Sequence, residues 1–240
     1  MKFWKRIDVI DDIAIVRIPF EYDNTIYNYA EEIGKRSKVV AVWGRLPETE
    51  RTFRTHTYVH LWGEKKSEVI YREYGVRFYL DFTKVFFSAK LKYEHFRVCS
   101  QVRKGEVIAN LFAGAGFFSI HCASKGASVV YSVDINPYAY YYTRANMELN
   151  RTWNVIPILG DTFKVYGEMG EVDRVISPLP ELYREAYEVS TKLTKRGGII
   201  HLFAETSKPE ELAQEFKASF YRIVRSSGPR KYHVILDIPR

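Results

Sequence analysis

The sequence is poor in the residues that build disulfide frameworks and metal sites. Its 240 residues include two cysteines, Cys99 and Cys122, and three methionines. Neither cysteine belongs to a metal-ligand spacing, so the chain lacks the pattern of a zinc-binding module. We therefore expect both cysteines to be reduced residues of the core, without a disulfide and without a bound metal.

Long apolar segments are also missing. No apolar run reaches the roughly 18–20 residues that a membrane-spanning helix needs. The amino terminus turns acidic at Asp8, too early for the apolar core of a signal peptide. These absences predict a cytoplasmic protein with no membrane partner, and we expect it to be a monomer.

Positive charge is present in excess and is unevenly distributed. The formal net charge is +7. Residues 1–104 hold 20 Lys and Arg against 14 Asp and Glu, whereas residues 105–240 hold 16 against 15. A basic first part indicates a polyanionic partner such as nucleic acid, although scattered surface cations explain the same balance.

The first part of the chain predicts a small α/β domain, which we place at residues 1–92. Residues 13–18 and 38–43 are strand-like, and residues 26–33 have helical spacing with Gly34 as the C-cap. Residues 68–75 and 76–81 predict a hairpin near Gly75. The polar segment 45–58 contains Arg54, either a contact to a partner or an ordinary surface residue.

Residues 93–240 predict a Rossmann-like α/β domain with a mainly parallel, doubly wound sheet. Strand-like and helical segments alternate from residue 107, which is typical of such sheets. The segment 107–120 predicts a strand, a turn at Gly114 and Gly116, and a helix. This is the nucleotide-binding corner of an open α/β sheet.

Polar and rigid residues follow the later strands of this domain. Asp134 ends a second strand about 20 residues past the glycine turn, where such folds place a carboxylate on ribose hydroxyls. Asp161 ends a third strand, and residues 178–180 follow a fourth. All lie at carboxyl ends of strands, where open sheets bind ligands. Helix capping is the alternative role for Asp134 and Asp161.

The glycine spacing indicates which nucleotide fits. The glycines do not follow the G-x-G-x-x-G pattern of dinucleotide sites. S-adenosylmethionine, an adenosine with an amino-acid tail and no pyrophosphate, fits the turn better. We therefore predict this cofactor.

Several motifs then resemble one family over nearly the whole chain. The segment NLFAGAGFF at 110–118 is similar to the D-x-F-A-G-x-G-x-F of the tRNA methyltransferase 5 / wyosine-synthesis protein 2 family. Residues 134–137 resemble its D-I-N-P. Residues 81–84 and 94–97 resemble the segment before the motif, and residues 226–230 its S-Y-A-P-R.

The resemblance implies a transferase that uses S-adenosylmethionine to modify guanosine 37 of tRNA, beside the anticodon. One branch transfers the methyl group to guanine N1, and the other transfers the aminocarboxypropyl group to a wyosine precursor. We favour methyl transfer. The residues implied are Lys90 and Pro180 for catalysis; Phe112, Gly114, Gly116, Asp134, Ile135, Asp161 and Pro178 for the cofactor; and Arg54, Lys84, Arg97 and Arg230 for tRNA.

Three positions depart from the family pattern. Asn110 replaces the motif acid, Pro178 replaces the Asn of N-L-P, and Lys90 replaces an Arg. Lysine is a point charge where arginine offers a planar bidentate fork. The departures imply an altered acceptor or a lost activity.

Two other classes of function remain open from the sequence. A non-catalytic tRNA-binding protein with the same fold would bind the cofactor without turnover. A methyltransferase of small molecules would have no affinity for tRNA.

Overall fold

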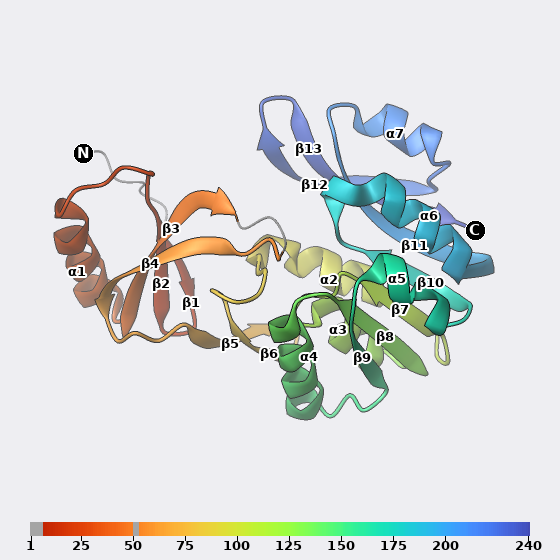
Figure 1. The fold of residues 1–240 in the computed structure, drawn as a ribbon, viewed down its shortest axis with the longest axis horizontal. Coiled ribbons are helices and arrows are strands. Elements are labelled where there is room, and N and C mark those ends of the chain that lie inside the picture. Colours follow the sequence, from red (N-terminus) through yellow and green to blue (C-terminus); the bar gives the residue numbers. More distant parts are fainter. Residues whose placement is uncertain (1–6, 50–52) are drawn as a thin grey trace. The chain divides into compact units, whose positions relative to one another are not determined.

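The computed structural model describes residues 7–49 and 53–240, and the chain divides into two compact units, Met1–Phe87 and Ser88–Arg240 (Figure 1). Among the described residues, no helix combines the length and apolarity needed to cross a bilayer.

The first unit is a four-stranded sheet covered by one helix, with a separate hairpin. The sheet order is β1-β2-β3-β4, and only β2 and β3 run parallel, connected through α1. Apolar side chains of α1, including Ile26, Ala30 and Ile33, pack on Val16 and Val42 of the sheet. The elements are β1 (Ile7–Ile10), β2 (Ile13–Arg17), α1 (Thr25–Ser37), β3 (Ala41–Thr49), β4 (His56–Gly63), β5 (Glu68–Glu73) and β6 (Val76–Asp81).

Gly34 lies inside α1, so its predicted role as the C-cap is wrong. The helix continues to Ser37, and Lys38 takes the left-handed capping conformation with φ 54°. A Cβ atom on Gly34 would lie 2.2 Å from the ring of Trp62. The glycine is therefore a packing residue that lets the indole of β4 lie against the helix backbone.

The second unit contains a seven-stranded sheet in the order β12-β13-β11-β10-β7-β8-β9. Strands β9, β8, β7, β10 and β11 run parallel, and β13 and β12 are antiparallel to their neighbours. This confirms the predicted Rossmann-like, mainly parallel sheet. The strands are β7 (Val107–Leu111), β8 (Val129–Asp134), β9 (Val155–Leu159), β10 (Val172–Ser177), β11 (Thr194–Thr206), β12 (Phe220–Gly228) and β13 (Lys231–Pro239).

Helices cover both faces of this sheet. Helices α5, α6 and α7 share one apolar core with the strands, while α3 and α4 pack against β8 and β9, and α2 packs on α3. Right-handed crossovers place the helices in this way. The helices are η1 (Ala89–Leu91), α2 (Lys92–Cys99), α3 (Phe117–Ser124), α4 (Pro137–Asn150), α5 (Thr162–Val165), η2 (Tyr166–Glu168), η3 (Pro180–Leu182), α6 (Tyr183–Leu193) and α7 (Pro209–Glu215).

Cys99 and Cys122 form a disulfide, so the expectation that both are reduced is wrong. Cys99 ends α2 and Cys122 lies in α3, and both are fully buried. Their Cα atoms are 4.6 Å apart because the two helices pack against each other. That separation falls within the range of natural disulfides.

Candidate functional site

The glycine turn between β7 and α3 is held in place by the elements that follow it. Gly114 and Gly116 both have positive φ, 56° and 82°, a conformation that glycine adopts without steric cost. Thr143 of α4 donates to the carbonyl of Gly114 at 3.2 Å, and Asn146 donates to that of Ala115 at 3.0 Å. A Cβ atom on Gly116 would lie 3.0 Å from the Thr143 hydroxyl. The turn is thus a fixed backbone surface, since the methyl group of Ala115 between the two glycines is buried.

Asp134 connects this turn to the end of β8. Its Oδ2 accepts from the Gly114 N–H at 2.6 Å, and its Oδ1 accepts from the Asn136 N–H at 2.9 Å. Asn136, and not Asp134, caps α4 by accepting from the N–H of Tyr138. The capping alternative for Asp134 is therefore excluded, and its carboxylate retains lone pairs for further donors.

Burial raises the pKa of Asp134 above its ordinary value, and the backbone N–H groups of Asn136, Gly114 and Ile135 partly offset this effect. The half-buried carboxylate is thus sensitive to any further donor placed against it. The N–H of Gly114, in contrast, is already used by Asp134. A ligand would meet the turn mainly through its bare backbone surface.

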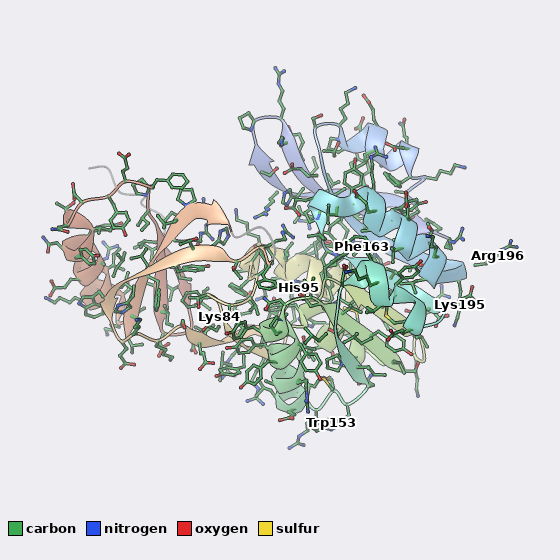
Figure 2. All side chains as sticks on the ribbon, viewed as in Figure 1. Lys84, His95, Trp153, Phe163, Lys195 and Arg196 are labelled. Atoms are coloured by element: carbon green, nitrogen blue, oxygen red, sulfur yellow. A yellow bond between two sulfur atoms is a disulfide. The ribbon has the colours of Figure 1, made fainter. Side chains whose placement is uncertain are left out.

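Apolar side chains surround the ends of β8 and β9. Ile135 is 48% exposed and Leu159 is 51% exposed, and Leu159 pairs with Asp134 across the two strands. The ring of Phe112, which follows β7, lies 5.7 Å from the ring of Phe163 in α5, and Phe163 is labelled in Figure 2. Exposed apolar side chains beside a fixed carboxylate can bind a nucleoside. The apolar side chains contact the flat base, and the carboxylate accepts from the sugar hydroxyls.

Asp161 has the capping role that the sequence left as an alternative. Its Oδ1 accepts from the N–H of Phe163 at 3.1 Å and so begins α5. Lys164 lies 3.8 Å from its other oxygen. This capping leaves Asp161 at the carboxyl end of β9, in the segment between Leu159 and Phe163.

Pro178 and Pro180 follow β10 at the same edge of the sheet. Pro180 is buried and begins η3, while Pro178 is half-buried. The hydroxyl of Ser177, the last residue of β10, is buried without a hydrogen-bond partner among the described residues. Lys90 is exposed in η1, which leads into α2.

Arg97 is placed differently from the prediction that it contacts tRNA. Its Nη1 and Nη2 donate to the carboxylate of Asp237 at 2.6 and 3.0 Å, and its Nε donates to Glu94 at 2.7 Å. The side chain is only 13% exposed. These contacts join α2 to β13, so Arg97 is a residue of the interior.

The Arg97–Asp237 pair continues into a buried network. Nδ1 of His201 lies 2.6 Å from Asp237, and its Nε2 lies 2.5 Å from Arg174. Burial lowers the pKa of His201, and this effect is larger than the opposite effect of Asp237, so the net shift is downward. A neutral His201 donates to Asp237 and accepts from Arg174, which satisfies all three side chains.

The other tRNA candidates lie on exposed or half-buried positions. Arg230 is exposed at the turn between β12 and β13, with φ 54°. In the first unit, Lys84 is exposed, and the guanidinium of Arg54 lies 5.0 Å from the centre of the Phe86 ring.

Asn110 shows what the substitution of the motif acid does. It is fully buried, and its amide donates to Ser119 of α3 at 2.9 Å, while Ser119 donates to Ser132 of β8 at 2.8 Å. Sequence reasoning missed this chain of contacts, and also the support that Thr143 and Asn146 give to the turn. The spacing of Thr143 and Asn146, three residues apart on one helix face, was the available signal.

A mainly parallel sheet with a glycine turn, an acid after the second strand and antiparallel last strands defines a class I methyltransferase fold. Residues 69–235 match the TRM5/TYW2 methyltransferase domain, and the chain belongs to this family.

Its relatives carry out more than one reaction. The chain is 49% identical to the tRNA 4-demethylwyosine(37)-methyltransferase Taw21 of Saccharolobus solfataricus, over 98% of this chain and 94% of the relative. It is 36% identical to the tRNA (guanine(37)-N(1))-methyltransferase Trm5b of Pyrococcus abyssi, over 96% and 73%. It is 31% identical to the tRNA(Phe) (4-demethylwyosine(37)-C(7)) aminocarboxypropyltransferase of Methanocaldococcus jannaschii, over 95% of each chain.

A solved structure, the complex of aTrm5 with tRNALeu, has the same fold. It superposes with a TM-score of 0.91 at 31% identity, over 98% of this chain and 72% of that one.

Proposed function

We propose that this protein transfers the methyl group of S-adenosylmethionine to nucleoside 37 of a tRNA, and that 4-demethylwyosine is its preferred acceptor. The observation that carries the cofactor assignment is the position of Asp134. Its carboxylate holds the glycine turn at the carboxyl end of β8, where the next residue, Ile135, is exposed.

The residues present fit S-adenosylmethionine. Asp134 would accept from the ribose hydroxyls, Ile135 and Leu159 would contact the adenine, and the backbone at Gly114 and Gly116 would admit the amino-acid tail. Because Gly116 has positive φ and faces Thr143, a side chain there would disturb the turn. Phe112, Asp161 and Pro178 complete the cofactor set.

The departures from the family pattern support a modified base as the acceptor. Pro178 has neither an N–H nor a polar side chain, so it cannot replace the Asn of the N-L-P motif as a partner of guanine. Lys90 likewise replaces the bidentate arginine. The 49% identical relative is named for 4-demethylwyosine, which agrees with a site built for a different base edge.

The residues then have separate roles in the transfer. Bound S-adenosylmethionine supplies an electrophilic methyl group on its sulfonium. The S–CH₃ bond would break as the bond to the base forms, and the base would release a proton to solvent or to a nearby carboxylate. Lys90 stabilises the negative charge that develops on the base oxygen. Pro178 and Pro180 form a stiff wall that keeps the base in line with the methyl group.

tRNA binding rests on positive charge. The first 104 residues hold six of the seven excess positive charges, and Arg54, Lys84 and Arg230 contact the tRNA backbone. Because cations that bind phosphates release counterions, affinity for tRNA falls steeply with added salt. The protein acts as a monomer without a metal.

The test uses three tRNA substrates that differ only at position 37: guanosine, 4-demethylwyosine and adenosine. Each is incubated with S-adenosylmethionine labelled either in the methyl group or in the aminocarboxypropyl carbons, and nucleoside 37 is analysed by mass. We expect methyl label on 4-demethylwyosine, less on guanosine and none on adenosine.

Two results would overturn this assignment. Aminocarboxypropyl label on 4-demethylwyosine would assign the chain to the reaction of its M. jannaschii relative. Cofactor binding with no transfer to any of the three tRNAs would indicate a non-catalytic tRNA-binding protein.

A further inference from the structure

The two edges of the sheet in the second unit differ in charge. The segments that precede β7 to β11 carry four cations and two carboxylates, and two further cations lie at the start of β11. The segments that directly follow the same strands hold one cation and one carboxylate, and β8 ends in a further carboxylate, Asp134. The cations before the strands are Arg103, Lys104, Lys125 and Arg151, those at the start of β11 are Lys195 and Arg196, and the carboxylates before the strands are Glu106 and Glu171. The amino edge is therefore a basic surface remote from the proposed transfer site.

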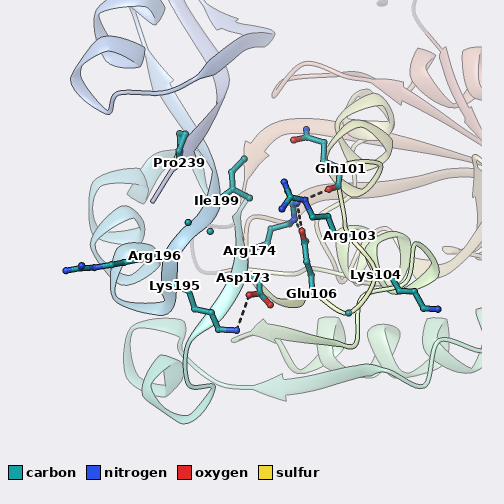
Figure 3. Close-up of a pocket in the computed structure, with 13 residues that line it drawn as sticks. Gln101, Arg103, Lys104, Glu106, Asp173, Arg174, Lys195, Arg196, Ile199 and Pro239 are labelled. Carbon is teal, nitrogen blue, oxygen red and sulfur yellow. Dashed lines mark hydrogen bonds and ion pairs between the residues drawn. The ribbon is translucent and has the colours of Figure 1, made fainter.

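A pocket of about 670 Å³ opens on this amino edge (Figure 3). One wall is the segment before β7, with Arg103, Lys104 and Glu106, and the other is the start of β11, with Lys195 and Arg196. Five cations line the pocket against two carboxylates. An anion is the ligand that this imbalance favours.

Both carboxylates of the pocket are already neutralised. Glu106 accepts from the buried Arg174 at 2.8 Å, and Asp173 accepts from Lys195 at 3.0 Å and from the N–H of Val107 at 2.8 Å. These acids therefore hold the floor of the pocket together and leave little negative charge to repel an anion.

The remaining cations are available to a ligand. The side chains of Arg103, Lys104 and Arg196 make no hydrogen bond or ion pair within the part of the chain that the structure describes. Arg196 and Lys104 extend outward on opposite sides of the pocket, with Lys195 and Arg103 between them. The positive charge thus forms a band that is longer than a single phosphate group.

We infer that this band is a second binding site, which takes the phosphate backbone of a single RNA strand. A linear polyanion can contact the outer cations, Arg196 and Lys104, and the inner cations, Lys195 and Arg103, at the same time. A compact polyphosphate can contact only the inner cations. No aromatic side chain lines the pocket, so bases gain no stacking surface there. The site contacts phosphates without reading bases.

The experiment measures binding of a fluorescent 12-nucleotide oligouridine by anisotropy across a series of salt concentrations. The test variant is Arg103→Ala/Arg196→Ala. The matched control is Arg144→Ala/Arg184→Ala, which removes two arginines from the outer faces of α4 and α6. We expect the test variant to lose about fivefold or more in affinity, and its log–log salt slope to fall by about 1.4, since each single-strand phosphate contact contributes about 0.7.

A second readout is lysine acetylation mapped by mass spectrometry. Bound oligouridine should protect Lys104 and Lys195 in the wild-type protein, but not Lys35 on α1, which is exposed in an ion pair with Glu31. Oligoadenosine should bind as tightly as oligouridine. A circular dichroism melt checks that both double variants are folded.

Three outcomes would overturn the inference. Equal losses in the two double variants would show that only overall charge matters, and an unchanged test variant would remove the pocket from RNA binding. Tripolyphosphate that displaces oligouridine at equal concentration would assign the site to a small phosphorylated ligand. Oligouridine has no guanosine, so a failure of methyl transfer on tRNA leaves this result untouched.

Discussion

The backbone N–H of Gly114 donates to Oδ2 of Asp134 at 2.6 Å, so the acid that ends β8 fixes the glycine turn that follows β7. One carboxylate therefore positions the backbone for the cofactor's tail and also faces the region where a ribose would lie. Removal of its charge should affect cofactor binding more than folding.

We expect Asp134→Asn to weaken S-adenosylmethionine binding by about tenfold or more, because hydrogen bonds to a charged group contribute about 1.5–3 kcal/mol. Isothermal titration calorimetry measures the change. Asp11→Asn is the control, since Asp11 also accepts from a backbone N–H, that of Ile70, but lies in the first unit. Unchanged affinity in folded Asp134→Asn would remove Asp134 from the cofactor site.

The same residue predicts a pH dependence. Burial raises the pKa of Asp134 above the ordinary 3.8, and only the ionised form accepts from both ribose hydroxyls. Affinity for S-adenosylmethionine should therefore be full at neutral pH and fall as the pH drops through this raised pKa. The fall should begin at a higher pH than for an ordinary aspartate, and it should be absent in Asp134→Asn.

Lys90→Ala should lower the single-turnover rate of methyl transfer by about 10- to 100-fold, the effect of one lost charged hydrogen bond to the developing oxyanion. The affinity for S-adenosylmethionine should not change. Lys90→Arg should retain most of the rate, and Lys92→Ala serves as the control at a neighbouring lysine. A wild-type single-turnover rate in Lys90→Ala would show that Lys90 does not act on the base.

Gly34→Ala should destabilise the first unit, although the same substitution in a free helix is stabilising by about 1 kcal/mol. The added methyl group would overlap the ring of Trp62, and overpacking of this kind costs about 1–3 kcal/mol. Urea denaturation measures the change. Glu32→Ala, at an exposed position of the same helix, should be close to neutral. A stabilised Gly34→Ala would show that Trp62 moves aside.

Reduction of the Cys99–Cys122 disulfide should lower the free energy of unfolding by about 3 kcal/mol, as expected for a loop of this length. Denaturation with and without a strong reductant measures the loss, and Cys99→Ser/Cys122→Ser should not respond to the reductant. Mass analysis of the alkylated protein counts free thiols directly. Two free thiols in the folded protein before reduction would contradict the disulfide.

Asp237→Asn should cost about 3–5 kcal/mol at pH 7, because it removes the buried charge that balances Arg97 and places an amide NH₂ against an N–H donor of Arg97 or His201. Burial acts to raise the pKa of Asp237, but hydrogen bonds from His201 and Arg97 outweigh it and hold the pKa well below its usual range. A depressed pKa stabilises the fold above the unfolded pKa of about 3.9. The difference between wild type and variant should thus stay constant from pH 8 to pH 5 and shrink below about pH 4. A difference that shrinks already between pH 7 and pH 5 would contradict this.

The sequence was sufficient to predict elements that depend on local pattern. The strand ending at Leu111, the glycine turn and the acid at Asp134 follow from apolar runs and from spacing that one βαβ unit imposes. The hairpin at Gly75 follows equally from turn chemistry: Tyr74 and Gly75, the two residues between its strands, both have positive φ. Such features need no knowledge of distant contacts.

Residues whose role depends on a distant partner could not be assigned in this way. Arg97 was assigned to tRNA because its motif precedes the glycine turn, but its partner Asp237 lies 140 residues further along the chain. The sequence predicts Gly34 as a cap because no neighbouring residue indicates that Trp62 packs against it. The disulfide likewise depends on the packing of α2 against α3, which no spacing encodes.

The strand order has a consequence for synthesis of the protein. Strand β13 lies between β11 and β12, although it follows both along the chain. Until residues 231–239 leave the ribosome, the edge of β11 stays unpaired, β12 has no strand partner, and Arg97 lacks its acceptor Asp237. Exposed edges of this kind invite pairing with other chains. A ribosome that stalls shortly before residue 231 would therefore release a polypeptide that tends to aggregate, so the synthesis of β13 protects the strands translated before it.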